Sequence, residues 1–176
     1  MGVLEVKQHL DKWGRGHDVI EHAESCATVE LAAQAIGVIP ARIAKSIAFA
    51  KNGYPKDIEP ASLPQVASEF GCILIVTAGD SKINSTKFKN HFGFKARMLP
   101  AEDTLAATGH AVGGVCPFAI DSERVDIFLD VSLKRFDTVF PACGSSNSLI
   151  ELSCDELAAY SGAKGWVDVC KGWEEG

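Results

Sequence analysis

The sequence lacks the features that mark several large classes of protein. Its longest apolar run, Cys72 to Val76, is far shorter than the roughly 18 residues that a membrane-spanning helix needs. The chain does not begin with a basic stretch followed by an apolar one, so we expect neither a secretory signal nor a membrane partner. The formal net charge of −6 argues against a protein that coats nucleic acid nonspecifically, because such proteins need a strongly basic face. A nucleic acid that touches the protein locally stays possible.

Metal-binding patterns are missing as well. The six cysteines include no CxxC pair, and the five histidines form no HExxH or HxH pattern. We therefore predict no metal and no cofactor. Without a secretory signal, reduced thiols in a cytoplasmic protein are the simplest interpretation.

The length of 176 residues fits a single domain, residues 1–176, around one core. Apolar periodicity and end signals alternate between helix and strand without a strict βαβ repeat, which predicts an α/β (α+β) fold with a mixed, curved sheet flanked by helices. We expect helices over 3–13, 29–36, 80–89, 100–109 and 153–160, and strands over 43–49, 72–77, 96–99, 125–131, 138–140, 149–152 and 166–169. The proline-containing stretch from Lys51 to Gly71 reads as an inserted loop with a short helix from Leu63 to Phe70.

The sharpest local feature is the segment from Gly113 to Phe118, Gly-Gly-Val-Cys-Pro-Phe, which follows His110 closely. Glycines allow positive φ and close approach of the backbone, so successive N–H groups can converge on a carbonyl or an oxyanion. A tight turn between two elements explains the same residues, and spacing alone favours that alternative.

Two charged residues lie in predicted strands. Lys45 is flanked by aliphatic residues, where an ammonium that enters a cleft could bind a phosphate or a carboxylate; an outward-facing strand lysine is the alternative. Asp130 ends a strand, where site residues are often presented, but a cap of the following turn is the simpler interpretation.

Two further segments are open to a functional and a structural interpretation. The loop from Gly144 to Ser148 could bind a ligand or form a hairpin, and its composition favours the hairpin. Cys116 could be a nucleophile with His110 as its base, but this needs a spatial contact that sequence proximity does not establish.

The stretch from Lys82 to Arg97 interleaves basic residues with Phe88, Phe92 and Phe94 and contains no acid. Such a pattern suits contact with a nucleic-acid backbone. A solvated helix face over core phenylalanines is the commoner explanation.

Together these segments resemble the YbaK/EbsC family, the free-standing relatives of the editing domain of bacterial prolyl-tRNA synthetases. The resemblance covers about Thr28 to Tyr160. The matching segments are 41–46 (ARIAKS), 76–80 (VTAGD), 109–118 (GHAVGGVCPF), 129–132 (LDVS) and 144–148 (GSSNS).

The resemblance implies a barrel-like sheet and metal-independent hydrolysis of the ester between a wrong amino acid and the terminal adenosine of tRNA. The expected substrate is tRNA-Pro carrying a small amino acid such as alanine or cysteine. A mischarged tRNA acceptor end is the implied partner, with prolyl-tRNA synthetase as a second candidate. The implied catalytic residues are Lys45, Gly113, Gly114 and Asp130. The implied substrate-binding residues are Arg42, Val115, Cys116, Pro117, Gly144, Ser145 and Ser146.

Two alternatives remain at this point. One is a non-catalytic module of the same fold that binds an aminoacyl-adenosine or a nucleotide-like ligand. The other is a cysteine-dependent hydrolase that uses Cys116. The 51–71 segment is longer than the hairpin expected after the lysine strand, so it could alter access to the substrate.

Overall fold

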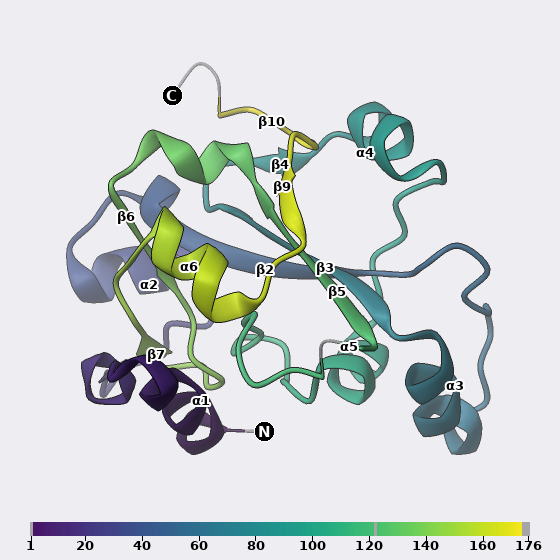
Figure 1. Cartoon of the computed structure of the whole chain (residues 1–176), viewed down its shortest axis with the longest axis horizontal. Coiled ribbons are helices and arrows are strands. Elements are labelled where there is room, and N and C mark those ends of the chain that lie inside the picture. Colours follow the sequence, from purple (N-terminus) through teal and green to yellow (C-terminus); the bar gives the residue numbers. More distant parts are fainter. Residues whose placement is uncertain (1, 122, 174–176) are drawn as a thin grey trace.

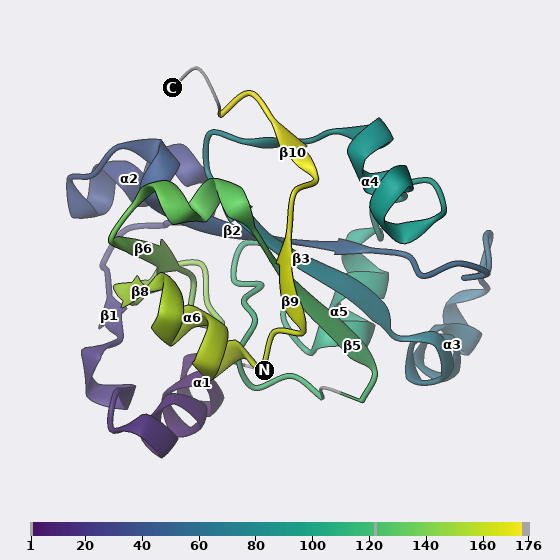
Figure 2. The ribbon, with the colours of Figure 1, turned by 45° about the horizontal axis from the view of Figure 1, so that its top comes forward.

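A computed structural model describes residues 2–121 and 123–173. At its centre is a six-stranded sheet with the order β8-β6-β2-β3-β5-β9, which curls across the molecule (Figures 1 and 2). The strands are β2 (Ile43–Phe49), β3 (Cys72–Ala78), β5 (Val125–Asp130), β6 (Thr138–Pro141), β8 (Leu152–Ser153) and β9 (Gly165–Val167). The β2–β3 and β6–β8 pairs are antiparallel, whereas β2–β6, β3–β5 and β5–β9 are parallel. The predicted mixed, curved sheet is confirmed.

The helices begin and end at local signals that the sequence carries. They are α1 (Val3–Leu10), α2 (Val29–Ile36), α3 (Leu63–Phe70), α4 (Ser85–Phe92), α5 (Ala101–Thr108) and α6 (Cys154–Ser161). The Thr28 hydroxyl accepts from the N–H of Leu31 to start α2, and Gly37 ends it in the left-handed conformation. Ser153 and Glu156 form the predicted capping box of α6.

Two short antiparallel pairs lie outside the main sheet. The pair β1 (Ile20–Glu21) and β7 (Ser148–Leu149) joins the N-terminal part to the region after β6, and β4 (Lys82–Ile83) pairs with β10 (Cys170–Lys171). Turns of 3-10 helix span Asp11–Trp13, Gly16–Asp18, Pro40–Arg42, Pro60–Ser62 and Val131–Arg135.

Several predicted boundaries were wrong for identifiable reasons. The helix expected over 80–89 begins only at Ser85, because the Asn84 side chain caps it and the preceding Lys82–Ile83 pairs with the distant β10. The strand expected over 149–152 is split, since Ser148–Leu149 pairs with β1 and Leu152–Ser153 pairs with β6. The strand expected over 96–99 is reduced to a single bridge between Phe49 and Met98.

The two faces of β2 and β3 are covered by different elements. On one face Ala44 and Val76 pack with Cys116 and Phe118 of the segment after α5. On the other face Phe49 and Ile75 pack with the phenylalanines of the α4 region, and Phe88 is fully buried there. In Figure 1, α4 and α5 lie on opposite sides of these strands. The alternation of side chains along β2 therefore decides which residue meets which cover.

The inserted segment between β2 and β3 contains α3, at the predicted bounds. This helix packs against α5, and the hydroxyl of Tyr54 donates to Asp103 of α5 at 2.9 Å. Arg97 in turn donates to the carbonyl of Tyr54 and lies over its ring. The insertion thus supports α5 from outside the sheet. In the part of the chain described, no helix is long and apolar enough to cross a membrane.

Candidate active site

Strand β2 has one closed and one partly open edge. Its β3 edge is paired continuously from Ala44 to Phe49, whereas its other edge pairs with β6 only at Ile43 and Ala44. Pairing resumes on that edge where the N–H of Leu99 donates to the carbonyl of Ala48 at 2.9 Å. Between these two points the edge of β2 lies open over Lys45 to Ile47.

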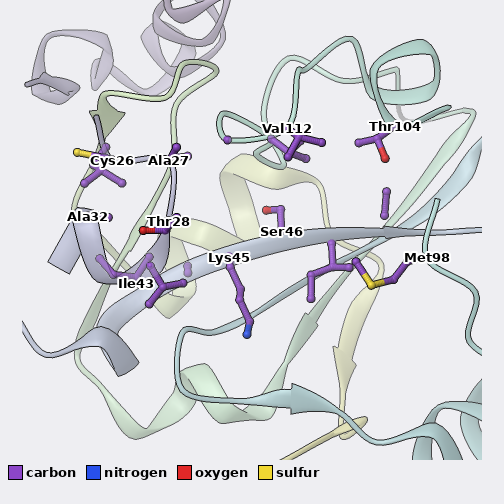
Figure 3. A pocket seen from close by; sticks show the side chains of 18 of the residues that line it. Cys26, Ala27, Thr28, Ala32, Ile43, Lys45, Ser46, Met98, Thr104 and Val112 are labelled. Atoms are coloured by element: carbon purple, nitrogen blue, oxygen red, sulfur yellow. The ribbon is translucent and has the colours of Figure 1, made fainter. Parts of the chain in front are cut away.

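A cavity of about 200 Å³ occupies this opening (Figure 3). Its walls come from the edge of β2, the start of α2, the 98–99 segment, α5 and the glycine loop 113–117. The residues that line it are mainly apolar or small. They are 26–29, 32, 43–48, 98, 99, 104, 112, 113, 115, 142 and 149. No Asp, Glu or His lies among these lining residues.

The glycine loop and the 144–148 loop are brought together beside the cavity. Gly113 has a φ of 99° and lines the cavity together with Val115. Gly114 is buried against the second loop: its carbonyl accepts from the N–H of Gly144 at 3.1 Å, and a Cβ on Gly114 would lie 2.7 Å from the nitrogen of Ser145. Glycine is required here because two backbones meet.

The second loop supports the cavity from behind. Ser145 bonds to Asn147 and Ser148, and the carbonyl of Ser146 accepts from the N–H of Cys26, which lines the cavity. Gly144 is buried, and none of Gly144, Ser145 and Ser146 is itself a lining residue.

Cys116 and Pro117 of the glycine loop turn into the core. Cys116 is fully buried, and burial raises the pKa of its thiol to about 12. His110 is close, with its Nε2 atom 3.6 Å from the sulfur, but burial lowers the pKa of this imidazole and its Nε2 also bonds to the carbonyl of Phe118 at 2.8 Å. A protonated thiol sealed from the cavity is a packing group, so the geometry opposes the cysteine-nucleophile alternative.

Lys45 lies at the cavity, but its ammonium leaves toward the opposite face of β2 (Figure 3). The Nζ atom donates to the carbonyl of Ser81 at 2.5 Å, and among the described residues no carboxylate forms an ion pair with it. Burial lowers the pKa of Lys45, while the charges of Cys170 and Asp80 act in the other direction. The ammonium therefore lies on the face of β2 opposite Ser46 and not over the centre of the cavity.

The other two charged candidates are held by the fold. Both oxygens of the buried Asp130 carboxylate accept main-chain N–H groups, those of Ser132 and Val169, each at 2.9 Å. Arg42 donates to Thr138 and Glu151 and lies over the ring of Phe140. Neither residue lines the cavity, so in this structure Asp130 caps the turn after β5 and Arg42 ties β6 to the 3-10 turn before β2.

The residue that sequence reasoning missed is Ser46. It points into the cavity from the face of β2 opposite Lys45 (Figure 3), and its Oγ atom is buried with no hydrogen-bond partner in the described part of the chain. A signal was present: alternate positions 44, 46 and 48 are all small, which leaves space on that face. Thr104 of α5 was missed as well, but its hydroxyl already bonds to the carbonyl of Leu99.

Comparison with known proteins identifies the family to which this chain belongs. Residues 23–160 match the aminoacyl-tRNA editing domain. The chain belongs to the aminoacyl-tRNA editing domain family. The YwhH protein of Bacillus subtilis, itself uncharacterized, is 50% identical over 174 residues, which cover 99% of this chain and 100% of that protein.

Solved structures agree with the family. A candidate trans-editing enzyme for prolyl-tRNA synthetase is 27% identical, with a TM-score of 0.78 over 97% of both chains. The hypothetical protein APE2540 is 24% identical, with a TM-score of 0.73 over 93% of this chain and 99% of that one, and this match shows the fold alone. The resemblance drawn from the sequence is confirmed.

Proposed function

We propose that the protein is a trans-acting aminoacyl-tRNA deacylase, which removes a small, wrongly attached amino acid from tRNA. The observation that carries the proposal is a small apolar cavity placed between the open edge of β2 and the glycine loop of an editing domain. A cavity of this size selects by exclusion, admitting small side chains and rejecting larger ones. Alanine and cysteine on tRNA-Pro are the first substrates to examine.

In the proposed reaction, water attacks the carbonyl carbon of the ester and the bond to the ribose oxygen breaks. The ribose hydroxyl leaves with a proton, and the amino acid leaves as a carboxylate with release of the other proton. The backbone of Gly113 and Val115, which line the cavity, supports charge that develops on the carbonyl oxygen in the manner of an oxyanion hole, whereas the N–H of Gly114 already donates to the carbonyl of Ala111 at 3.0 Å. Because no acidic or imidazole side chain lines the cavity, a hydroxyl or thiol of the substrate is the proposed activator of the water.

The proposed path of the tRNA end leaves the cavity past Lys45. The positive charge of Lys82 acts on Lys45, so these two cations lie near each other, and Lys89 and Lys95 are exposed further along the same region. Phe88, Phe92 and Phe94 pack into the core, with a centroid distance of 4.6 Å between Phe88 and Phe92, so they do not serve as stacking platforms. The cations alone supply the proposed grip on phosphates.

The rim of the cavity offers an apolar surface for the terminal adenine. Met98 and Val112 line the cavity and are 65% and 67% exposed. Such exposed apolar side chains next to a cavity are typical of a ligand-binding mouth. A cytoplasmic location and an association with prolyl-tRNA synthetase belong to the proposal.

The deciding experiment is a deacylation assay of the purified protein against a panel of mischarged tRNAs, including alanyl- and cysteinyl-tRNA-Pro. We expect hydrolysis of at least one small mischarged pair and at least tenfold slower hydrolysis by Lys45→Ala. Unchanged hydrolysis by Lys45→Ala would remove that residue from the proposal. Lack of activity on every pair would refute the deacylase.

A non-catalytic module that binds an aminoacyl-adenosine is the second candidate, favoured by the absence of Asp, Glu and His among the lining residues. Stoichiometric binding of an intact aminoacyl ester without turnover would support it.

A further inference from the structure

The side chain of Ser46 is a polar group without a partner in an otherwise apolar cavity. Its Oγ atom is buried, and in the described part of the chain nothing accepts from it or donates to it. A buried hydroxyl that lacks a hydrogen bond has lost its contacts with water without replacing them, which destabilises the folded protein. A bound ligand that supplies the missing partner would recover this energy.

The main-chain groups of Ser46 are also available to a ligand. In an antiparallel ladder, alternate residues direct both N–H and C=O toward the same neighbour. The carbonyl of Ala48 accepts from Leu99 and the N–H of Ala50 donates to Arg97, so the even-numbered residues of β2 face away from β3. Ser46 shares this direction, and its position lies between the last residue paired with β6, Ala44, and the contact at Ala48.

Ser46 therefore presents one N–H, one C=O and one hydroxyl to the cavity: its register partner in β3, Val76, lies on the other side of the strand, and pairing with β6 has ended at Ala44. This is the donor and acceptor pattern that one residue of an antiparallel strand recognises in another. An aminoacyl ester carries the complementary pattern: an α-amino group that donates and, one carbon away, a carbonyl oxygen that accepts.

We propose that the open edge of β2 binds the aminoacyl group as a one-residue strand, with the Ser46 carbonyl accepting from the α-amino group and the Ser46 N–H donating to the ester carbonyl. The inference rests on the proposed deacylase function and specifies its substrate class: α-aminoacyl esters with a free amino group. Antiparallel pairing directs the ester oxygen toward Lys45, because the residue after the paired one lies opposite the residue before Ser46.

The same pairing fixes the stereochemistry. Paired L-residues of two neighbouring strands place their side chains on the same face of the sheet. An L-aminoacyl side chain would therefore enter the cavity beside the Ser46 hydroxyl, whereas a D-aminoacyl side chain would be directed toward the face that carries Lys45. The inferred site selects the backbone of the amino acid and its L-configuration, while the cavity volume limits the size of the side chain.

The first test uses the wild-type protein and changes only the substrate. L-alanyl-tRNA, N-acetyl-L-alanyl-tRNA and D-alanyl-tRNA are compared in the deacylation assay. N-acetylation replaces the charged ammonium by a neutral amide N–H, which still donates, and adds bulk that points into the 97–99 segment, so we expect kcat/KM to fall at least tenfold because of this clash and the lost charge. We expect a similar loss for the D-alanyl substrate. Equal rates for the free and the acetylated ester would overturn the inference and leave the deacylase standing.

The second test changes the protein. Ser46→Pro removes the outward-facing main-chain N–H together with the hydroxyl and fixes φ, at a position on the open edge where proline is tolerated, so we expect a near wild-type Tm and at least a tenfold loss of kcat/KM. The matched control is Ile47→Pro, which removes an N–H directed at β3 and is expected to lower Tm markedly. Ser46→Ala is the matched control for the hydroxyl: it keeps the main chain, and it should lower kcat/KM for L-alanyl-tRNA several-fold less than Ser46→Pro. A folded Ser46→Pro variant with wild-type kcat/KM would refute the inference.

A binding measurement separates failure of the inference from failure of the proposed function. The probe is 3′-(L-alanylamino)-3′-deoxyadenosine, a stable amide, titrated by calorimetry into wild-type protein and into Ser46→Pro. If no ester is hydrolysed but the probe binds the wild type at least tenfold more tightly than the variant, the deacylase is refuted and the Ser46 site is supported. Equal binding to the two proteins, or binding to neither, overturns the Ser46 site.

Discussion

Replacing Gly114 with alanine tests whether two backbones in contact define the candidate site. An added Cβ would lie 2.7, 2.8 and 2.9 Å from the nitrogen of Ser145, the carbonyl carbon of Gly144 and the carbonyl carbon of Ser145. All three are main-chain atoms, so no side chain can rotate away. The two loops must separate by about 0.7 Å to reach an ordinary contact of 3.4 Å.

The loss in the free energy of unfolding follows from the contacts that this separation disturbs. Overpacking of this kind destabilises by about 1–3 kcal/mol. Weakening the bond from the N–H of Gly144 to the carbonyl of Gly114 adds about 1 kcal/mol. Alanine stiffens the unfolded chain, which offsets about 0.4–1 kcal/mol. The expected net loss is about 1–3.6 kcal/mol, which in a chain of this length lowers Tm by about 2–14 °C.

The assay is thermal unfolding followed by circular dichroism, with deacylation measured on the same samples. Gly165→Ala is the matched control, because a Cβ there meets nothing within 4 Å and its φ is not positive. This control should keep or slightly raise Tm. A Gly114→Ala protein as stable as wild type would refute the close contact between the loops.

Three further predictions concern buried groups. Cys116→Ala should keep kcat/KM within about twofold, because burial raises the pKa of the thiol to about 12 and Cys116 does not line the cavity. A loss of more than tenfold in a folded variant would restore the hypothesis that Cys116 is a nucleophile. Asp130→Asn replaces one of two buried acceptors by a donor and should lower the free energy of unfolding in urea by about 1–3 kcal/mol, with KM unchanged; an unaltered urea midpoint contradicts the capping role. Burial lowers the pKa of His110 below its usual 6.5, so the unfolded state takes up more protons and stability is lost as pH falls below 6.5. His110→Gln should flatten the fall in Tm between pH 7 and 5; equal slopes in the wild type and the variant would contradict this assignment.

The parts of the fold that the sequence predicted best are those set by local chemistry. Thr28 and Gly37 bound α2, and Ser153 with Glu156 begins α6, because a cap is satisfied by atoms a few residues away. The region from Asp80 to Lys89 was predicted poorly, since Lys82–Ile83 becomes a strand only by pairing with residues near the end of the chain. Nothing in the sequence near Lys82 indicates that Cys170–Lys171 will be its partner strand.

In the candidate site, too, local features could be predicted from the sequence and features set by the whole sheet could not. The glycine loop and Lys45 were visible as unusual residues in their local settings. The direction of Lys45 was not, because strand alternation separates residues 45 and 46 onto two faces without saying which face carries the cavity. Ser46 gained its importance from where the pairing with β6 stops, which is a property of the whole sheet.

The open edge of β2 also bears on whether a second molecule could pair with this sheet. Unpaired strand edges are templates on which a second molecule can add a strand, and long exposed edges lead to aggregation. Here the opening spans only Lys45 to Ile47 and closes again at Ala48, and the glycine loop and α5 stand over it. The proposed one-residue substrate matches the length of this gap, whereas a strand from another chain would find few free groups to pair with.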